Sequence, residues 1–364
     1  MFWLLCLVAL IALLWAIARF RLQGEDLSSY DVPRYDPVRR VPSPEHAAVL
    51  EKVRQFGADA QRQRGRLRLH GLRAAMDALG DAADLDGISV TPVTADAIPA
   101  EWITAAGGSA DERLLYLHGG AFTLGSARSH RVLTTEIARR TGLAVLAIDY
   151  RLMPEHPRSA GIDDCRRAYR WLLANGPAGP APVRRLFVAG DSAGGNLTLM
   201  LIAWARDAGL RPPDGAIALS PLTDSTLASP SLSYNEHQDP MLGPMARLLN
   251  RVPRPLLLWF ALLQSRRNPS DPELSPLRGD LSHLPPVLVQ ASEAEILIDD
   301  ARRYVNRARA QGSPAELETW HGMVHVWQIF GRELPEADEA LARLAAFVER
   351  CRQLRETAPR ARTA

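Results

Sequence analysis

The pentapeptide Gly190-Asp191-Ser192-Ala193-Gly194 is the clearest chemical signal in the sequence. It fits the pattern Gly-x-Ser-x-Gly and stands between an expected strand at residues 186–189 and an expected helix at residues 193–208. A serine on such a tight turn has a strained backbone and an exposed hydroxyl, and the turn aims the Ala193 amide at a developing negative charge. The pattern predicts that Ser192 is a nucleophile. The alternative is a serine that caps an ordinary helix.

A serine hydroxyl becomes nucleophilic only when a base accepts its proton, so a histidine must accompany Ser192. His325 follows the last expected strand, at residues 316–320, and its loop lies at the same edge of the predicted sheet as Ser192. We expect His325 to be this base. His321 is closer to the end of the strand and is the alternative, and either residue could instead be an ordinary core histidine.

The base in turn needs a carboxylate that orients it. In the order serine, acid, histidine, this carboxylate follows the strand expected at residues 287–290. Asp299 and Asp300 open the next helix, where acidic side chains stabilise the helix N-terminus without any catalytic role. Glu295 stands in the loop before that helix and is our choice, with Glu293 and the two aspartates as alternatives.

A glycine-rich turn, His118-Gly119-Gly120-Ala121, ends an earlier expected strand at residues 114–117. Glycines at this position let backbone amides approach a substrate closely, and such amides stabilise a negatively charged oxygen. We expect the amides of Gly119, Gly120 and Ala193 to form an oxyanion hole. A plain glycine turn is the alternative.

Apolar stretches alternate with helical stretches through the body of the chain, which predicts parallel βαβ units buried on both faces. The fold class is therefore α/β, with a mostly parallel central sheet flanked by helices. The expected strands are residues 88–94, 100–105, 114–117, 143–148, 186–189, 216–219, 287–290 and 316–320. The expected helices between and after them are residues 129–140, 163–174, 193–208, 299–311 and 336–353. Parallel strands present their carboxyl ends at one edge, where the candidate residues would meet.

Two segments interrupt this alternation, and we expect both to cover the site. Residues 223–286 are predicted to be an inserted helical cap, with helices at 241–249 and 255–264, whose apolar residues 256–260 line an acyl pocket or pack inside the cap. Residues 45–85 are predicted to be N-terminal cap helices, broken near residues 57–65. The core is then residues 86–222 and 287–353, and residues 354–364 are a flexible tail.

Residues 1–18, MFWLLCLVALIALLWAIA, contain no charged side chain, and Arg19 and Arg21 follow them. A helix of this length spans about 27 Å, enough to cross a thin bilayer. We expect residues 1–21 to be an apolar membrane anchor, with a cleaved signal segment or a core helix as alternatives. The arginines favour a cytoplasmic catalytic domain over a periplasmic or secreted one. Residues 22–44, which hold four prolines, are predicted to be a stiff linker.

The composition excludes several classes of protein. Lys plus Arg total 43 and Asp plus Glu total 41, with no long block of one sign, so we expect no nucleic-acid partner. The cysteines Cys6, Cys165 and Cys351 are widely scattered and show no metal-binding or redox spacing. We expect no metal and no organic cofactor, and the oligomeric state stays open.

Five blocks of the chain resemble the bacterial hormone-sensitive-lipase-like esterases, the fold-3 family of the α/β-hydrolases. The blocks are HGGAFTLGSARSHR (118–131), DYRLMPEHP (149–157), GDSAGGN (190–196), SEAEILIDDA (292–301) and GMVHVW (322–327). The resemblance covers roughly residues 85 to 350. It implies an α/β-hydrolase fold in which N-terminal helices and an insert form a cap over the site.

The resemblance also implies roles for individual residues. Ser192 would be the nucleophile, Glu295 the acid and His325 the base of a catalytic triad, while Gly119, Gly120 and Ala193 would supply the oxyanion amides. It leads us to expect a serine carboxylic-ester hydrolase for short- to medium-chain esters of small molecules. A lactone or amide hydrolase with the same triad is the alternative within enzymes, and a non-catalytic ligand-binding protein is the alternative of another class.

Three departures from the family pattern bear on this expectation. Ala121 replaces the third glycine of the family's HGGG motif, which narrows the space for bulky ester alcohols. Glu295 stands where many relatives have aspartate, which leaves Asp299 as a competitor. Residues 158–161 read Arg-Ser-Ala-Gly instead of Phe-Pro-Ala-Ala, which alters a pocket wall. We expect structural roles for Asp191 and for residues 154–157.

Overall fold

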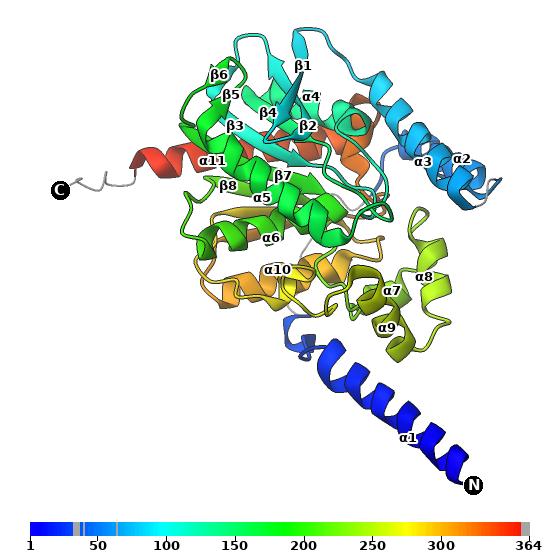
Figure 1. The fold of residues 1–364 in the computed structure, drawn as a ribbon. Helices are drawn as coiled ribbons and strands as arrows, with labels where there is room; N and C mark the ends of the chain where they lie inside the picture. Colours follow the sequence, from blue (N-terminus) through cyan, green and yellow to red (C-terminus); the bar gives the residue numbers. More distant parts are fainter. Residues whose placement is uncertain (32–36, 39–40, 63–64, 358–364) are drawn as a thin grey trace.

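The computed structural model describes residues 1–31, 37–38, 41–62 and 65–357 of the chain. Its centre is a sheet in the order β1-β2-β4-β3-β7-β8-β9-β10, in which β1 and β2 run antiparallel to their neighbours and the other strands are parallel (Figure 1). The strands are β1 Ile88–Ala95, β2 Ile98–Ala105, β3 Ser109–Leu117, β4 Leu143–Ile148, β7 Arg185–Asp191, β8 Gly215–Leu219, β9 Val287–Ser292 and β10 Ala315–Trp320. The expected α/β class and the mostly parallel sheet are confirmed.

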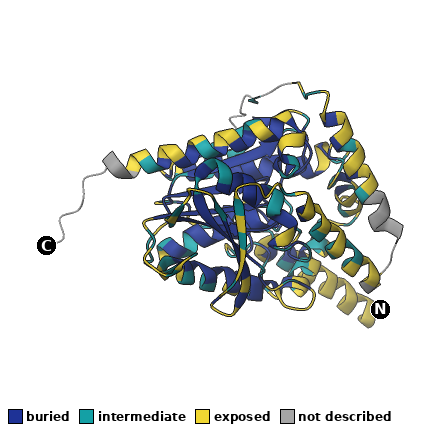
Figure 2. Cartoon of the chain, turned by 90° about the horizontal axis from the view of Figure 1, so that it is seen from above, coloured by how far each residue is buried: buried dark blue, intermediate teal, exposed yellow. Residues whose placement is uncertain are grey.

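The inner strands form because their residues are apolar on both faces. Every residue of β4, β7, β8 and β9 is buried, as a parallel sheet covered by helices requires. Figure 2 shows this buried centre surrounded by helices whose outer surfaces are exposed. The outer strand β1 alternates between exposed and partly buried residues, which matches its place at the edge.

Helices cover both faces of the sheet. The helices α4 Arg131–Thr141 and α11 Pro335–Thr357 pack on one face, in a cluster that includes Leu133 and Leu344. The helices α5 Arg158–Ala174, α6 Ala193–Asp207 and α10 Ile298–Ala310 pack on the other. The predicted helices of the core are all present. One local prediction was wrong, because α5 begins five residues earlier than expected. A small hairpin of β5 Asn175–Gly176 and β6 Gly179–Pro180 follows α5.

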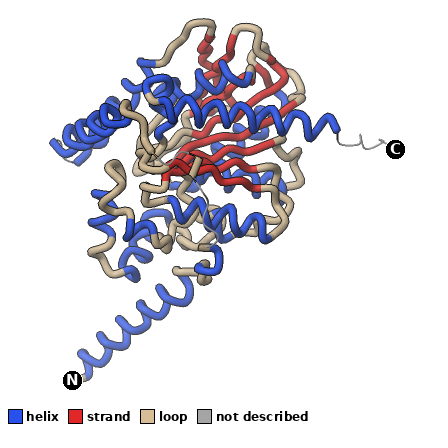
Figure 3. Tube along the Cα trace, turned by 180° about the vertical axis from the view of Figure 1, so that it is seen from behind, coloured by secondary structure: helices blue, strands red, loops and turns tan. Residues whose placement is uncertain are grey.

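The two cap segments lie at the side of the molecule where the parallel strands end (Figure 1). The N-terminal segment forms α2 His46–Arg62 and α3 Gly65–Leu79, and the inserted segment forms α7 Ser231–Tyr234, α8 Gly243–Leu249 and α9 Arg254–Ser265. The short helix α7 was not predicted. Short helical turns complete the chain at η2 Ser28–Tyr30, η3 Gly80–Ala82, η4 Arg128–His130, η5 Pro276–Arg278 and η6 Trp327–Glu333. Figure 3 shows the loops that join these caps to the strand ends.

The N-terminal apolar segment forms a helix that projects away from the body (Figure 1). It comprises α1 Phe2–Ile17 and the continuing turn η1 Ala18–Leu22, and it is the one helix among the described residues long and apolar enough to cross a membrane. No residue of α1 is buried.

The segment predicted to be a stiff linker packs against the body wherever the structure describes it. Leu27 is buried in the main core, and Asp31 forms an ion pair with Arg303 of α10. The linker prediction is therefore wrong for Leu27 and Asp31, because it depended on the prolines at positions 33 to 44 and these two residues precede them. Of the predicted tail, residues 354–357 belong to α11, and residues 358–364 lie outside the described residues.

Candidate active site

Ser192 occupies the sharp turn between β7 and α6. Its backbone has φ 52° and ψ −114°, a conformation that costs a residue with a side chain about 1–3 kcal/mol. The turn is held by the Ser192 amide, which donates to the Leu219 carbonyl of the neighbouring strand at 2.8 Å. The side chain is only partly buried, as a nucleophile requires.

The glycines beside this turn are required by its close packing. A Cβ on Gly194 would lie 1.8 Å from the Leu117 carbonyl oxygen. A Cβ on Gly190 would lie 2.5 Å from that same oxygen and from the carbonyl oxygen of Gly194. The helix α6 can begin directly against β3 only because both positions lack a side chain, which explains the Gly-x-Ser-x-Gly pattern in this chain.

His325 and Glu295 meet at the same edge of the sheet as this turn, although a helix and a strand separate them in the chain. The imidazole Nδ1 lies 2.6 Å from the Glu295 Oε2, and the two side chains are 5% and 0% exposed. A carboxylate can only accept a hydrogen bond, so Nδ1 carries the proton and Nε2 has a free lone pair. Among the described residues, Nε2 is buried and has no hydrogen-bond partner.

The charge of Glu295 tunes this histidine. Burial alone lowers the pKa of His325, but the hydrogen bond and the negative charge of Glu295 outweigh it, so the pKa is raised above its ordinary value. Asp239 of the inserted cap and Asp191 add smaller contributions in the same direction. The arrangement stabilises an imidazolium, the species that forms when the base accepts a proton.

The other carboxylates predicted as alternatives have different partners. Asp299 accepts the Ser231 amide at 2.9 Å and pairs with Arg302, and Glu293 also pairs with Arg302. Asp300 accepts the amides of residues 223 and 224 at 2.6 and 2.9 Å. The alternative base, His321, is exposed. The structure thus brings together Glu295 and His325 and directs these alternatives elsewhere.

The oxyanion prediction needs one correction. The Gly119 amide donates to Asp191 Oδ1 at 3.0 Å, so its hydrogen is already used. Within the described residues, the amides of Gly120 and Ala121 donate to no backbone or side-chain acceptor, and the two residues have positive φ angles of 109° and 53°. The sequence pattern shows that glycines are present but not where their amides point. The amides still available beside Ser192 are those of Gly120, Ala121 and Ala193.

Asp191 organises the underside of the site, in line with the structural role expected for it. It accepts the Tyr116 hydroxyl at 2.7 Å and faces His130 Nε2 at 3.3 Å, in addition to the Gly119 amide. Burial raises the pKa of Asp191, but His130 and Tyr116 outweigh it and lower the pKa. The carboxylate thereby ties the oxyanion loop to the end of β7.

Three polar residues that the sequence analysis missed fasten the acid and base loops. The Ser292 amide donates to Glu295 Oε1 at 2.7 Å, and its hydroxyl donates to the Met323 carbonyl at 2.6 Å. The Asn235 amide nitrogen donates to the Glu295 carbonyl at 2.9 Å. The Ser220 hydroxyl accepts the amide of the residue after His325 at 3.3 Å. Ordinary serines and asparagines carry no sequence signal for such contacts.

The altered segment after Pro157 places an arginine beneath the oxyanion loop. The Arg158 guanidinium lies 3.8 Å from the centre of the Phe122 ring and donates to Asn196 Oδ1 at 2.9 Å. It is buried, and burial lowers the pKa of Arg158 to about 9. Phe122 follows the oxyanion amides and Asn196 follows Ser192 by one helical turn, so Arg158 links these two parts of the site.

The N-terminal cap supports the same loops from outside. The Arg73 Nε donates to the Thr123 carbonyl at 2.8 Å, and its guanidinium pairs with Glu155. Val49 and Val53 of α2 pack in the cluster that contains Val324, next to His325. The expected structural role of residues 154–157 agrees with the Glu155 contact.

The residues 256–260 do not form one apolar surface. Leu258 is buried against Ala18 and Leu22, whereas Leu256 and Phe260 are exposed. The interpretation of this stretch as a single acyl pocket is therefore wrong for these residues, because a helix turns successive side chains to different faces.

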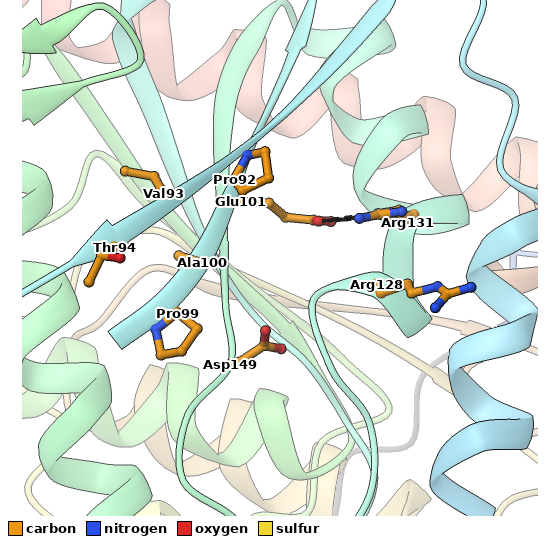
Figure 4. Close-up of a pocket in the computed structure, with 9 residues that line it drawn as sticks. All are labelled: Pro92, Val93, Thr94, Pro99, Ala100, Glu101, Arg128, Arg131 and Asp149. Atoms are coloured by element: carbon orange, nitrogen blue, oxygen red, sulfur yellow. Dashed lines mark hydrogen bonds and ion pairs between the residues drawn. The ribbon is translucent and has the colours of Figure 1, made fainter. Parts of the chain in front are cut away.

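A separate hollow of about 470 Å³ is lined by residues of β1, β2, η4 and the start of α4, together with Asp149. Figure 4 shows its lining, which includes the ion pair of Glu101 with Arg131 and the carboxylate of Asp149. None of the candidate catalytic residues lines it. Among the described residues, no group of three or more His, Cys, Asp or Glu side chains is placed to hold a metal ion.

Comparisons with known proteins show the family to which the chain belongs. Residues 114–329 match the family described as having the alpha/beta hydrolase fold. An esterase of Acinetobacter venetianus is 36% identical over 260 residues, 71% of this chain and 82% of that protein, and an acetyl-hydrolase of Streptomyces hygroscopicus is 38% identical over 257 residues, 70% and 81% of the two chains. A crystal structure of an esterase from the bacterial hormone-sensitive lipase family superposes with a TM-score of 0.74 at 38% identity, covering 85% of this chain and 99% of that one.

Proposed function

Because this chain belongs to the α/β-hydrolase family of bacterial hormone-sensitive-lipase-like esterases, we propose that it hydrolyses carboxylic esters of small molecules through a Ser192–His325–Glu295 triad. Carboxylic ester hydrolysis is the activity that the names of its relatives share. The proposal goes beyond this shared activity in three points: the identity of the triad, an acyl-enzyme intermediate and a preference for short to medium acyl chains.

One observation carries the proposal. The imidazole of His325 is held by Glu295 at 2.6 Å, and within the described part of the chain its other nitrogen is buried without a hydrogen-bond partner. Ser192 occupies a turn of strained geometry at the same edge of the sheet. A buried polar atom without a partner costs about 1–3 kcal/mol, so this nitrogen, on an imidazole that a carboxylate orients, calls for an explanation. A base waiting for the proton of Ser192 is such an explanation.

In the first half of the reaction, His325 Nε2 accepts the proton of Ser192 as the serine oxygen attacks the ester carbonyl carbon. The carbonyl oxygen becomes an anion and is stabilised by the amides of Gly120, Ala121 and Ala193. The bond to the alcohol oxygen then breaks. The imidazolium returns its proton to the leaving alcohol, and the acyl group stays on Ser192.

In the second half, water attacks the acyl-enzyme, and His325 accepts one of its protons. The tetrahedral intermediate forms in the same oxyanion hole, and its collapse releases the carboxylic acid while the proton returns to Ser192. Glu295 stays ionised throughout and holds the imidazole in the required tautomer. The ester and one water molecule are consumed, and Ser192 and His325 return to their starting protonation states.

The proposal predicts that Ser192→Ala abolishes esterase activity in the full-length protein. We expect the hydrolysis of p-nitrophenyl esters, from acetate to laurate, to fall by about 10⁴-fold or more, because the nucleophile is lost while the fold is kept. The exposed Ser233→Ala is the matched control and should retain full activity. Thermal unfolding of both variants checks that the fold is intact.

A fluorophosphonate probe separates the outcomes. Labelling of the wild type and the Ser233→Ala control, and none of Ser192→Ala, would support the assignment. Labelling without hydrolysis of any ester would point to a lactone or amide substrate for the same triad. A folded wild type that neither hydrolyses esters nor reacts with the probe would refute the catalytic proposal.

For the apolar segment, the proposal is a membrane anchor formed by residues 1–18, with the catalytic domain on the cytoplasmic side. The exposed α1 helix and the arginines at its C-terminal end support both parts.

A further inference from the structure

The inserted cap exposes a continuous apolar stripe. Leu256, Phe260 and Leu263 of α9 are 59%, 63% and 74% exposed. They are spaced four and three residues apart and therefore lie on one face of the helix. Three large apolar side chains in a row are costly in water, which indicates that a partner covers this face.

The opposite face of α9 is fixed to the base of the N-terminal helix. Leu258 is buried against Ala18 and Leu22. The Trp259 indole Nε1 also donates to the Leu14 carbonyl at 3.2 Å. The exposed stripe is thus held beside the proposed membrane span and cannot turn away from it without breaking this packing.

The neighbouring helix α8 adds to the exposed surface. Met245 and Leu248, three residues apart, are 49% and 63% exposed. We refer to the exposed side chains of α8 and α9 together as the cap patch. Its members are Met245, Leu248, Leu256, Phe260 and Leu263.

Arginines that form no ion pair with a carboxylate of the described residues flank α9 in the chain and follow α1. Arg19, Arg21, Arg251 and Arg266 are exposed, and no carboxylate of the described residues pairs with them. Elsewhere on the surface, most arginines are paired, as in the contact between Arg128 and Asp81 at 2.7 Å. Exposed apolar side chains with arginines beside them match the acyl chains and anionic headgroups of a bilayer surface.

The helices that carry the cap patch lie on the same side of the molecule as the candidate active site. Figure 1 shows α7, α8 and α9 beyond the carboxyl ends of the parallel strands, and α1 leaves the body from this same side. A bilayer crossed by α1 would therefore meet α9 before it met the sheet. The edge of the sheet that carries Ser192 and His325 would face the membrane.

We propose that the cap patch rests in the interfacial layer of an anionic bilayer, so that esters dissolved in the membrane reach the site from beneath the cap. The inference that the cap docks on a bilayer depends only on these exposed residues and not on the proposed esterase function. The substrate class rests on the proposed esterase function.

A lipid surface fits these observations better than a second copy of the chain. In a symmetric dimer, the same patch meets itself, which would bring the unpaired arginines of both copies together. Like charges placed opposite each other at an interface cost several kcal/mol. An anionic bilayer instead neutralises them.

The position of the cap patch can be measured by lipid quenching. The full-length protein carries Leu263→Cys labelled with bimane, in a Cys6→Ser background that removes the exposed native thiol. The control carries the label at Leu85→Cys, an exposed apolar position that precedes β1 at the opposite edge of the sheet. Both are reconstituted in vesicles of phosphatidylglycerol and phosphatidylethanolamine that contain nitroxide-labelled lipid.

We expect strong quenching at position 263 and little at position 85. Replacing phosphatidylglycerol by phosphatidylcholine should weaken the quenching at 263, because the arginines lose their counter-charge. Equal quenching at the two positions would overturn the proposal.

A kinetic comparison tests the access of substrate. The variant Leu256→Ser/Phe260→Ser/Leu263→Ser removes the stripe, and Leu85→Ser/Leu354→Ser removes exposed apolar residues elsewhere. We expect the first variant to lose about tenfold in the hydrolysis of a long-chain ester dissolved in the vesicles, because its cap no longer enters the interface. It should keep its activity on p-nitrophenyl acetate in water, and the control should keep both.

The remaining outcomes separate this inference from the proposed function. Equal activity of wild type and stripe variant on the vesicle ester, with both active in water, would overturn the inference alone. A wild type inactive on both esters would refute the esterase proposal, and the quenching result would still decide the docking. A stripe variant that turns a detergent-solubilised dimer into a monomer would assign the patch to a subunit interface and overturn the membrane proposal.

Discussion

Glu295 and His325 are 30 positions apart, yet their side chains meet at 2.6 Å in a buried setting. The contact raises the pKa of His325, because the carboxylate outweighs the effect of burial. A general base works only in its neutral form, so activity should fall as the pH drops through this raised pKa. Removing the carboxylate lowers the pKa of His325 and should move this acid limb of the pH profile to lower pH.

We therefore predict that Glu295→Gln lowers kcat by up to about 10⁴-fold, since the amide can also hold the wrong tautomer. We expect the acid limb of kcat/KM to shift downward by about 1 pH unit. Stopped-flow hydrolysis of a soluble ester across the acid range measures both. Asp299→Asn is the control, because Asp299 bonds to Ser231 and Arg302 instead. A shifted limb in Asp299→Asn and an unshifted one in Glu295→Gln would transfer the role to Asp299.

At the scale of elements, a buried ion pair anchors the inserted cap. Asp224, just after β8, and Arg278, in η5, pair at 2.9 Å with 0% and 3% of their side chains exposed. Burial raises the pKa of Asp224, but Arg278 outweighs it and the pKa is lowered. The pair closes the cap at both of its ends, because these two residues flank α7, α8 and α9 in the chain.

Breaking this pair should destabilise the protein strongly. We predict that Arg278→Met lowers the free energy of unfolding by about 3–5 kcal/mol, because Asp224 is left buried and unpaired. The loss should grow as the pH rises. In the folded variant, burial without Arg278 raises the pKa of Asp224 above its value in the unfolded chain, so ionisation of this carboxyl group favours unfolding. Urea unfolding at several pH values measures this effect.

The exposed pair of Arg128 and Asp81 is the matched control for this experiment. Arg128→Ala should cost about 1 kcal/mol or less, because solvent screens this contact. A loss in Arg278→Met no larger than that of the control would contradict the anchoring role of the buried pair.

At the scale of the whole molecule, the chain combines a packed hydrolase body with a helix that the body does not bury. No residue of α1 is buried, and only its C-terminal end and the turn that follows it contact α9 among the described residues. We predict that the full-length protein resists extraction from membranes by alkaline carbonate. Replacing two central residues, Leu10→Arg and Leu13→Arg, should release it, because each arginine costs about 2.5–3.5 kcal/mol in the middle of a span.

The matched control places the same two arginines in an exposed part of the body, at Leu85 and Leu354. This variant should stay in the membrane fraction, which is assayed by sedimentation and immunoblotting. Release of the unaltered protein by carbonate would contradict the anchor.

The sequence by itself determined the α/β class, the order of strands and helices and the main chemical candidates. Apolar runs in the inner strands and the glycines around Ser192 are local properties, because each reflects a conformation that the nearby backbone must adopt. From the sequence, Glu295 was a choice among four carboxylates. The prediction that the Gly119 amide belongs to the oxyanion hole was wrong. Which acid reaches His325, and where each amide points, depends on loops from distant parts of the chain.

Only the tertiary structure decided such contacts. It showed that Asp191 already occupies the Gly119 amide and that Ser292 and Asn235 hold the acid loop. It also showed that the segment predicted as a linker is pinned to α10 through Asp31. A single sequence records which side chains are available. The three-dimensional packing chooses their partners, because every buried hydrogen-bonding group must find one among residues far away in the chain.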